Sequence, residues 1–405
     1  MEKDIQKNST GRAWLITIVV ILAGIISSAG KYKLAGTMTT IIPALGITKA
    51  DGGWLMSICS VMGIVLALPA GGIMVKTGPK KLGLVALGCG LIGNVIGSLS
   101  NGFSLLLFSR LIEGISIGLI GVVAPTIIAA WFPSEKRGLP MAIWSLWIGL
   151  GLLFILNATN YILPPFGWHG VWWFSTLLFL VITVLFALIV KMPESTGSAS
   201  EKANAPKVPL SAGMKSPSTW AVAMVMLVLG FSVGTVQTYT PAYIQEALKV
   251  TKEVANTYTS VFALGNIFGG IAMGFVLNKV KNRSLVLLVS TILVAIVMAF
   301  AFEFSLNSAL IFMLVTGIIY QMVPASIFAV APETASSPQT VGIAMGIIII
   351  GQNVGAFFGP PKVGALVQAG GWHAAQFPLI VMGIVGIVAA ILFYMLMKRK
   401  SAANA

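Results

Sequence analysis

The sequence predicts an all-α polytopic membrane protein in which twelve transmembrane helices form two repeated halves of six helices each. Of its 405 residues, 57% are hydrophobic and only 9% are charged, whereas a soluble protein carries charge at roughly a quarter of its positions. The apolar runs are about 20 residues long, which is enough to cross a hydrocarbon core about 30 Å thick. Short sequence patterns of the first half also recur in the second half. Together these observations exclude a soluble globular domain.

Charged and turn-forming residues separate the apolar runs and set the limits of the expected helices. A stretch at 192–217 is rich in Ser, Ala, Pro and Lys, which is typical of a flexible linker. We therefore expect one six-helix bundle at 1–191 and a second at 218–405, joined by this linker. The expected spans are 13–40, 53–74, 82–100, 104–131, 139–162, 171–191, 218–242, 254–278, 284–303, 307–331, 340–366 and 374–397.

Two landmarks indicate the internal repeat. The dipeptide Thr-Lys at 48–49 returns at 251–252, which is 203 positions later. The triplet Gly-Trp-His at 167–169 returns at 371–373, at a spacing of 204. A repeat of this length is far longer than the periods of solenoid proteins, and it is typical of the parallel halves of a secondary transporter.

Basic residues are concentrated on one side of the expected helices. If both termini are cytoplasmic, 18 of the 25 Lys and Arg residues lie in inner segments and three lie in outer loops. This asymmetry predicts a multi-pass protein of the cell membrane with both termini in the cytoplasm. The net charge of +14 therefore faces the anionic lipids of the bilayer, and a nucleic-acid partner is not expected.

Two lysines interrupt the first apolar run. Lys31 and Lys33 lie past the middle of the 13–40 span, where a charge is costly and usually functional. They are about 200° apart around a helix, so both cannot face one cavity squarely. Either one or both extend toward the outer headgroups, which is expected more readily of Lys33 than of Lys31, or at least one of them faces a polar cavity. The sequence leaves open which of the two faces the cavity.

The fourth expected span also carries two ionisable residues. Arg110 and Glu113 are three positions apart and therefore share one helix face. As neighbours they can neutralise each other in a structural ion pair, or they can take part in proton coupling or gating. The sequence leaves both interpretations open.

The second half offers uncharged polar residues within its expected spans. Such side chains either bond neighbouring helices together or bind a substrate. They are Gln237, Tyr239, Asn266, Tyr320, Gln321, Gln352 and Asn353. Cys59 and Cys89 stand apart in apolar runs, and the two histidines, His169 and His373, fall in expected outer loops. No metal site, cofactor or nucleophile–base pair is indicated, which argues against an enzyme.

With these residues in place, the chain resembles the major facilitator superfamily over almost its whole length. The stretch 71–80 is similar to the loop motif G-x-x-x-D-[RK]-x-G-[RK]-[RK], although Val75 and Pro79 depart from it. Its glycines suit close helix packing and a tight turn. The matching positions are Gly71, Lys76, Gly78 and Lys80. Residues 110–114 are similar to the fourth-span motif R-x-x-[QE]-G.

The chain also resembles the anion:cation symporters and the cyanate and nitrate permeases within this superfamily. The resemblance is carried by Lys31, by the stretch 45–54 and by motifs at 331–333, 351–353 and 359–372. It implies that Lys31 takes the place of a first-span arginine that meets the carboxylate of the substrate. It also implies that spans one, four, seven and ten line a site near the middle of the membrane.

Charge within the spans indicates the class of substrate. The basic Lys31, Lys33, Arg110 and Lys362 outnumber the acidic Glu113, even if Glu303 at the outer end of the ninth span is counted with it. A positively biased cavity concentrates anions. We expect a monomeric secondary transporter that moves a small organic or inorganic anion, a carboxylate or a cyanate-like ion, by proton symport or by exchange with a counter-anion. Lys31 would be the charge partner of the anion, and the seven uncharged polar residues would hydrogen-bond to it. Arg110 and Glu113 would serve coupling or gating.

Export of hydrophobic drugs or metabolites by proton antiport is the alternative. The spans contain many Met, Phe and Trp residues, which suit a lipophilic substrate. An exporter of cations, however, would need a buried carboxylate in the first or seventh span, and neither span has one. A channel is less consistent with the sequence, because two repeated halves joined by a flexible linker favour alternating access.

Overall fold

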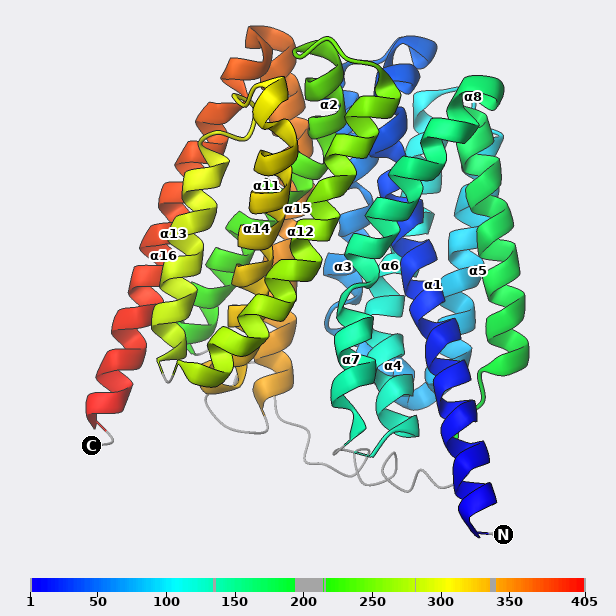
Figure 1. Ribbon diagram of the computed structural model, residues 1–405, viewed down its shortest axis with the longest axis vertical. Helices are drawn as coiled ribbons and strands as arrows, with labels where there is room; N and C mark the ends of the chain where they lie inside the picture. The colour runs from blue at the N-terminus through cyan, green and yellow to red at the C-terminus, as the bar shows by residue number, and fades with distance from the viewer. Residues whose placement is uncertain are drawn as a thin grey trace.

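The computed structural model describes residues 2–133, 136–193, 214, 216–280, 282–335 and 340–403 (Figure 1). Over these ranges the protein consists of helices joined by short loops, without a strand. Both termini lie at one end of the molecule, termed the lower end, and the segment around Lys49 lies at the opposite, upper end. The linker predicted at 192–217 falls almost entirely outside the described residues, so its limits stay a prediction.

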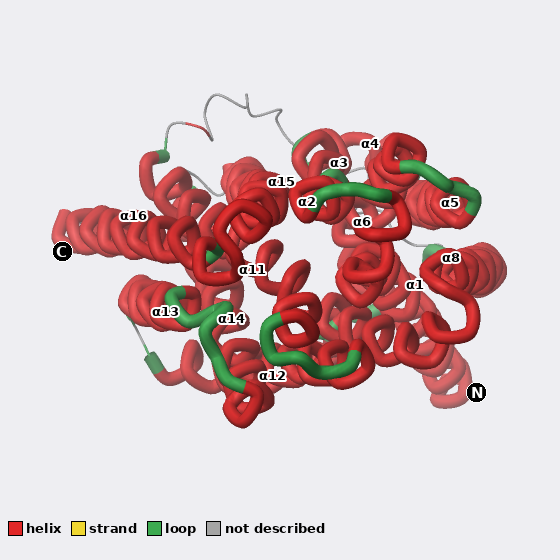
Figure 2. The backbone as a smooth tube through the Cα atoms, turned by 90° about the horizontal axis from the view of Figure 1, so that it is seen from above, coloured by secondary structure: helices red, strands yellow, loops and turns green. Residues whose placement is uncertain are grey.

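Two bundles of helices stand side by side (Figure 2). The amino-terminal bundle contains α1 (Glu2–Leu45), α2 (Lys49–Ser57), α3 (Cys59–Leu66), α4 (Pro69–Thr77), α5 (Pro79–Ser98), α6 (Phe103–Trp131), α7 (Gly138–Ser145) and α8 (Trp147–Ile189). The carboxyl-terminal bundle contains α11 (Pro217–Glu246), α12 (Lys252–Lys279), α13 (Arg283–Met298), α14 (Leu306–Thr334), α15 (Val341–Ala374) and α16 (Gln376–Ala403). Every expected span coincides with a helix or a short series of helices, so the predicted architecture is confirmed.

The two Gly-Trp-His triplets have the same backbone conformation. Gly167 in α8 has φ 63° and ψ −171°, and Gly371 in α15 has φ 72° and ψ −174°. Positive φ favours glycine, because a Cβ would be strained there, and each glycine turns the chain between two consecutive spans. Thr48 and Thr251 also correspond, since each caps a helix by accepting a hydrogen bond from a backbone N–H. The repeat seen in the sequence is therefore present in the fold.

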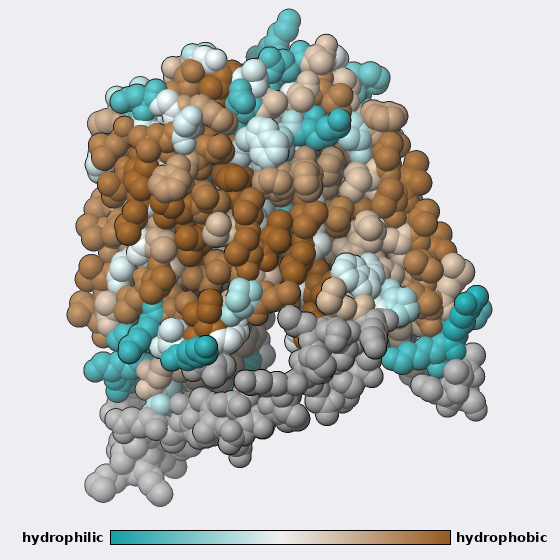
Figure 3. All heavy atoms as spheres, turned by 180° about the vertical axis from the view of Figure 1, so that it is seen from behind, coloured by the Kyte–Doolittle hydropathy of each residue, from teal (hydrophilic) through white to brown (hydrophobic). Residues whose placement is uncertain are grey.

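An apolar belt surrounds the middle of the molecule. Figure 3 shows a brown band of hydrophobic side chains between polar groups at the upper and lower edges. Among the described residues, ten helices are long and apolar enough to cross a membrane, and α13 is a shorter apolar helix. One of the ten, at 138–189, contains both the fifth and the sixth expected span. These features define a multi-pass membrane protein.

The two bundles touch closely toward the upper end. There α2 packs against α15, and a Cβ added to Gly53 would lie 2.6 Å from the carbonyl oxygen of Pro360. Such close approach of two backbones requires a residue without a side chain. At the lower edge the described surface is hollowed between the two halves (Figure 3).

Candidate functional site

A network of charged side chains lies buried inside the amino-terminal bundle. Lys33 of α1 is 0% exposed, and its Nζ donates to both carboxylate oxygens of Glu113, Oε1 at 3.0 Å and Oε2 at 3.1 Å. The same ammonium donates to Oδ1 of Asn94 in α5 and lies 4.5 Å from the ring centroid of Trp172 in α8. The expectation that Lys33 extends to the outer headgroups is therefore wrong, because its partners lie inside the bundle.

Arg110 of α6 is the second cation of this network. Its Nη1 donates to Oε2 of Glu113 at 2.5 Å, so the two residues form the ion pair that their spacing allows. Nη1 also donates to the carbonyl oxygen of Gly30 at 2.8 Å, and Nη2 donates to that of Lys31 at 2.7 Å. Nε donates to the carbonyl oxygen of Leu55 in α2 at 3.2 Å. Arg110 thus ties α1, α2 and α6 together at one level of the bundle.

Glycines let the helices of the network approach closely. A Cβ at Gly93 in α5 would lie 2.7 Å from Cγ of Glu113, and a Cβ at Gly114 in α6 would lie 2.5 Å from the carbonyl oxygen of Cys59. Small residues act in this way at helix contacts in membranes. The close contact brings the charged groups within hydrogen-bond distance, and buried charges that are paired and hydrogen-bonded are tolerated in a bundle core.

Lys31 is the cation that the network leaves without a carboxylate. It is partly exposed, although its neighbours Tyr32 and Lys33 are buried. No Asp or Glu among the described residues forms an ion pair with it, and its Nζ lies 5.6 Å from the ring centroid of Tyr32. With 3.6 residues per turn, Lys31 is about 180° around α1 from Leu22, which is exposed on the apolar outer side of the helix. The exposed part of Lys31 therefore faces away from the lipid side.

The network and Lys31 together carry an excess of positive charge. Glu113 offsets one of the two network cations, and Lys31 adds a further charge that no carboxylate among the described residues offsets. Two other ionisable residues near or within the expected spans do not belong to the network. Lys362 is exposed one helical turn from the exposed Phe358, and Glu303 contacts His373 at the upper surface.

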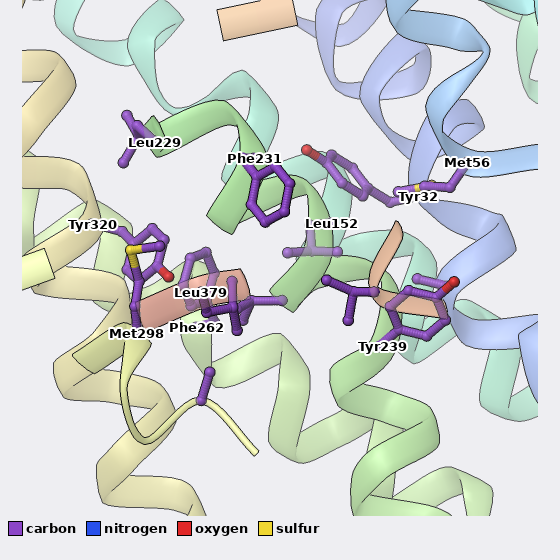
Figure 4. Close-up of a cluster of buried hydrophobic side chains, with 14 of the residues drawn as sticks. Tyr32, Met56, Leu152, Leu229, Phe231, Tyr239, Phe262, Met298, Tyr320 and Leu379 are labelled. Atoms are coloured by element: carbon purple, nitrogen blue, oxygen red, sulfur yellow. The ribbon is translucent and has the colours of Figure 1, made fainter. Parts of the chain in front are cut away.

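The two predicted tyrosines of the carboxyl-terminal bundle are both engaged within the protein. The hydroxyl of Tyr239 donates to the carbonyl oxygens of Lys49 at 2.7 Å and Pro360 at 3.0 Å, where the halves meet. The hydroxyl of Tyr320 accepts a hydrogen bond from Ser232 at 2.8 Å. Figure 4 shows both rings in a cluster of buried side chains that draws on both halves. In this conformation the hydroxyl proton of Tyr239 is used by the protein, and the hydroxyl of Tyr320 already accepts one hydrogen bond.

The predicted amides differ in how they are partnered. Gln237 is 2% exposed, and its Oε1 accepts no hydrogen bond from the described residues. Asn353 donates to the carbonyl oxygen of Ile349 at 3.0 Å, within its own helix. Three further amides are partly exposed, namely Asn266, Gln321 and Gln352. A buried polar atom without a partner is costly, so Gln237 has a buried acceptor to spare.

The loop-motif residues lie where α4 meets α5. Gly78, with φ 80°, ends α4 and precedes α5, so the expected tight turn is present. Lys76 lies in the last turn of α4, and Nζ of Lys80 donates to the carbonyl oxygen of Ala187 in α8 at 2.8 Å. A Cβ at Gly71 would meet nothing within 4 Å. The close packing expected at that glycine is therefore absent.

Contacts between the halves close the upper end. Lys49, at the start of α2, forms an ion pair with Glu246 of α11. Lys252, which the repeat relates to Lys49, donates to Oγ1 of Thr40 in α1 at 2.8 Å. Each half thus extends a lysine from the start of its second span to the other half. These two contacts and the hydrogen bonds of the Tyr239 hydroxyl are termed the upper seal.

Sequence reasoning missed several residues of these arrangements, among them Asn94, Trp172 and Lys49. Asn94 is a polar side chain inside the third apolar run, and that polarity was a usable signal for a buried network. Trp172 and Lys49 gave no such signal, because an aromatic ring or a lysine near the end of a span is typical of the membrane interface. Only the packing of the helices assigns them their partners.

Replacing Tyr239 with phenylalanine is expected to loosen the upper seal. The change keeps the ring but removes a donor to two carbonyl oxygens, and a hydrogen bond is worth about 1 kcal/mol. The labelling rate of a cysteine introduced at Asn256, which is buried at the upper end, should therefore rise about fivefold in a background without Cys59 and Cys89. An unchanged labelling rate would show that the hydroxyl does not hold the halves together.

Two repeated helical bundles in a membrane, with buried charges and a closure at one end, define the class of secondary transporters. A family model described as Major Facilitator Superfamily matches residues 20–252 and 230–405 of the chain. The chain therefore belongs to the major facilitator superfamily. Its relatives are transporters, which confirms the expectation that the protein is not an enzyme.

Curated relatives include transporters of several kinds. The chain is 25% identical over 399 residues to the 3-(3-hydroxy-phenyl)propionate transporter of Escherichia coli, covering 96% of this chain and 94% of the relative. It is 26% identical over 177 residues to the niacin transporter NiaP of Acinetobacter baylyi, covering 44% and 40%. It is 22% identical over 200 residues to the probable multidrug resistance protein EmrY of Escherichia coli, covering 49% and 39%. The last two alignments span less than half of those relatives.

Solved structures show the same fold. A crystal structure of a D-xylose-proton symporter superposes with a TM-score of 0.72 at 18% identity, covering 94% of this chain and 97% of the symporter. A bacterial homologue of the human lysosomal transporter Spinster, in an inward-facing and unoccupied conformation, superposes with a TM-score of 0.75 at 14% identity, covering 95% and 96%.

Proposed function

We propose that the protein moves a small anion, a carboxylate or a cyanate-like ion, across the cytoplasmic membrane by alternating access. The observation that carries this proposal is the environment of Lys31. It is a partly exposed cation at membrane depth, it faces away from the lipid side of α1, and it has no ion-pair partner among the described residues. A charge in such a place is costly and usually functional. An anion is the ligand that would neutralise it.

In this proposal Lys31 is the charge partner of the anion. Its carbonyl oxygen accepts a hydrogen bond from Arg110, so a change in the ion pair of Arg110 and Glu113 would act directly on the backbone that carries Lys31. This link makes Arg110 and Glu113 candidates for coupling or gating. Hydrogen bonds from the second half would complete the site, from Gln237, Tyr239, Asn266, Tyr320, Gln321, Gln352 and Asn353. The two tyrosines could contribute once their present hydrogen bonds open.

The orientation of the chain follows from its basic residues. Arg137 precedes α7, Lys279 lies in the last turn of α12 and Lys400 in the last turn of α16. These helix ends lie at the lower end, with both termini (Figure 1), and a bias of basic residues supports a cytoplasmic position for that end. The upper seal then closes the outer side, and the hollow at the lower edge opens toward the cytoplasm. Rocking of the two halves would break the seal and expose Lys31 to the outside. A monomer suffices, because each chain contains both halves.

The names of two relatives agree with an anionic substrate. The relative that aligns over nearly the whole chain is a transporter of 3-(3-hydroxy-phenyl)propionate, which is a carboxylate, and another is a niacin transporter. Proton symport and exchange with a counter-anion are both compatible with the excess of positive charge that Lys31, Lys33 and Arg110 carry over Glu113. An inward proton gradient would drive uptake of an anion by symport, because the accompanying proton moves down its gradient.

Export of a hydrophobic drug or metabolite by proton antiport is the second candidate. The similarity of the chain to two resistance proteins favours this candidate. One is the probable multidrug resistance protein EmrY, and the other is the lincomycin resistance protein LmrB of Bacillus subtilis, to which the chain is 28% identical over 178 residues. The buried cluster of Figure 4, in which Tyr32, Phe231 and Met56 take part, would offer an apolar surface to such a substrate. A lipophilic cation, however, would not neutralise the positive charge of Lys31.

Uptake into proteoliposomes tests the proposal. We expect saturable uptake of at least one labelled anion from a panel of 3-(3-hydroxyphenyl)propionate, nicotinate, acetate and cyanate. Stimulation by an inward proton gradient would indicate symport, and stimulation by internal unlabelled anion would indicate exchange. Liposomes without protein are the control. Efflux of a lipophilic cation, with no uptake of any anion, would contradict the proposal and favour the exporter.

A further inference from the structure

Lys33 is a buried cation to which the proposed anion site assigns no role. Its Nζ is surrounded by groups from three other helices, namely Glu113 of α6, Asn94 of α5 and Trp172 of α8. Because it is 0% exposed, it does not meet the anion in this conformation. Burying a lysine in a membrane protein is costly, so its presence there requires an explanation.

Two cations share the carboxylate of Glu113 unequally. Lys33 donates to both oxygens, at 3.0 Å and 3.1 Å, whereas Arg110 uses one nitrogen, Nη1, to donate to Oε2 at 2.5 Å. Cys59 also packs against this group, but its Sγ donates to the carbonyl oxygen of Arg110 at 3.1 Å. Lys33 therefore supplies the donors that a bidentate arginine would otherwise supply.

The remaining nitrogens of Arg110 hold the backbones of two helices. Nη2 donates to the carbonyl oxygen of Lys31 at 2.7 Å, and Nε donates to that of Leu55 at 3.2 Å. An arginine that faces a carboxylate alone favours two parallel hydrogen bonds to it. Without Lys33, Glu113 would draw a second nitrogen of Arg110 to itself, and the carbonyl oxygen of Lys31 would lose its donor.

We infer that Lys33 is a positioning residue of the anion site, an inference that rests on the proposed function of Lys31. By neutralising Glu113, Lys33 leaves Nη2 of Arg110 bound to the backbone of Lys31. This hydrogen bond places the ammonium of Lys31 where the anion meets it. Lys33 acts through Arg110 and does not touch the anion.

Transport kinetics of two variants test this role in proteoliposomes, with the labelled anions of the panel as probes. Lys33→Met keeps the bulk of the side chain but removes its charge, so the KM for the anion should rise about tenfold at equal amounts of reconstituted protein. The double variant Lys33→Met/Glu113→Gln also removes the carboxylate that competes for Arg110. Its KM, measured as exchange of labelled for unlabelled anion without a proton gradient, should return to within about threefold of the wild type, because the two changes are strongly coupled. Vmax of the double variant is expected to stay lowered, since Glu113 is also a candidate for coupling or gating. Lys362→Met, on an exposed helix surface, is the matched control with an unchanged KM.

A purely structural role of Lys33 predicts a different result. In that case both variants would lower Vmax through loss of folded protein and leave KM unchanged, and the inference would be overturned. A KM that stays raised in the double variant would overturn it as well, because Glu113 would then not be the group that displaces Arg110.

A measurement without substrate separates this inference from the proposed function. If the wild type takes up none of the labelled anions, the proposed function is wrong, and thermal unfolding in detergent then tests the pairing by itself. Lys33→Met should unfold at a lower temperature than the double variant, because the single change leaves a buried carboxylate short of a partner. A single variant as stable as the double variant would contradict the neutralisation of Glu113 by Lys33.

Discussion

Replacing Lys31 with glutamine is expected to reduce saturable anion uptake by at least about 30-fold, because truncating one partner of a buried charge pair costs about 2–5 kcal/mol. Glutamine can still donate a hydrogen bond, but it carries no charge. The carbonyl oxygen of Lys31, which accepts from Arg110, belongs to the backbone and survives the substitution. The fold should therefore persist. The loss of uptake should appear as a raised KM and a lowered Vmax for the labelled anions in proteoliposomes.

The control for this variant is Lys362→Gln. It removes the same charge from a membrane helix, but at an exposed position, so uptake should stay within about twofold of the wild type. Lys31→Arg, which restores the charge with a different shape, should recover part of the uptake. If Lys31→Gln transports the anion as well as the wild type, the assignment of the site is wrong.

Replacing Gly364 with alanine is expected to open the upper seal and to slow transport. A Cβ at this position would lie 2.1 Å from Oη of Tyr239 and 2.5 Å from the carbonyl oxygen of Lys49. Overpacking of this kind costs about 1–3 kcal/mol, which would shift the equilibrium about 5- to 150-fold toward the state that is open at the upper end. The cycle needs both states, so uptake should fall while labelling of a cysteine at position 256 rises.

The matched control is Gly102→Ala. Gly102 also lies at the upper end, but a Cβ there would meet nothing within 4 Å. Its labelling and uptake should therefore resemble those of the wild type. Equal effects of the two glycine substitutions would mean that the loss of backbone freedom, rather than contact between the halves, controls the equilibrium. No change in labelling for Gly364→Ala would contradict the proposed closure.

The architecture can be predicted from the sequence because each membrane helix depends on the residues of its own segment. A run of apolar residues of sufficient length forms a spanning helix wherever it lies in the chain, since the bilayer leaves no other way to satisfy its backbone. Gly167 and Gly371 mark the same turn in both halves, because that backbone conformation favours glycine. Arg110 and Glu113 also pair as their spacing allows, because three positions along a helix bring two side chains together.

The candidate site depends on contacts that no local rule predicts. The sequence determined that Lys31 and Lys33 point in different directions, because the angle between them is a property of one helix. Only the tertiary structure decided that Lys33 is buried among α5, α6 and α8, because Glu113 lies 80 positions from Lys33 along the chain, while Lys31 stays partly exposed. Helix packing also turned Tyr239 toward Lys49, 190 positions away. Apolar runs specify where helices form, but the partners of a buried charge are set by which helices meet.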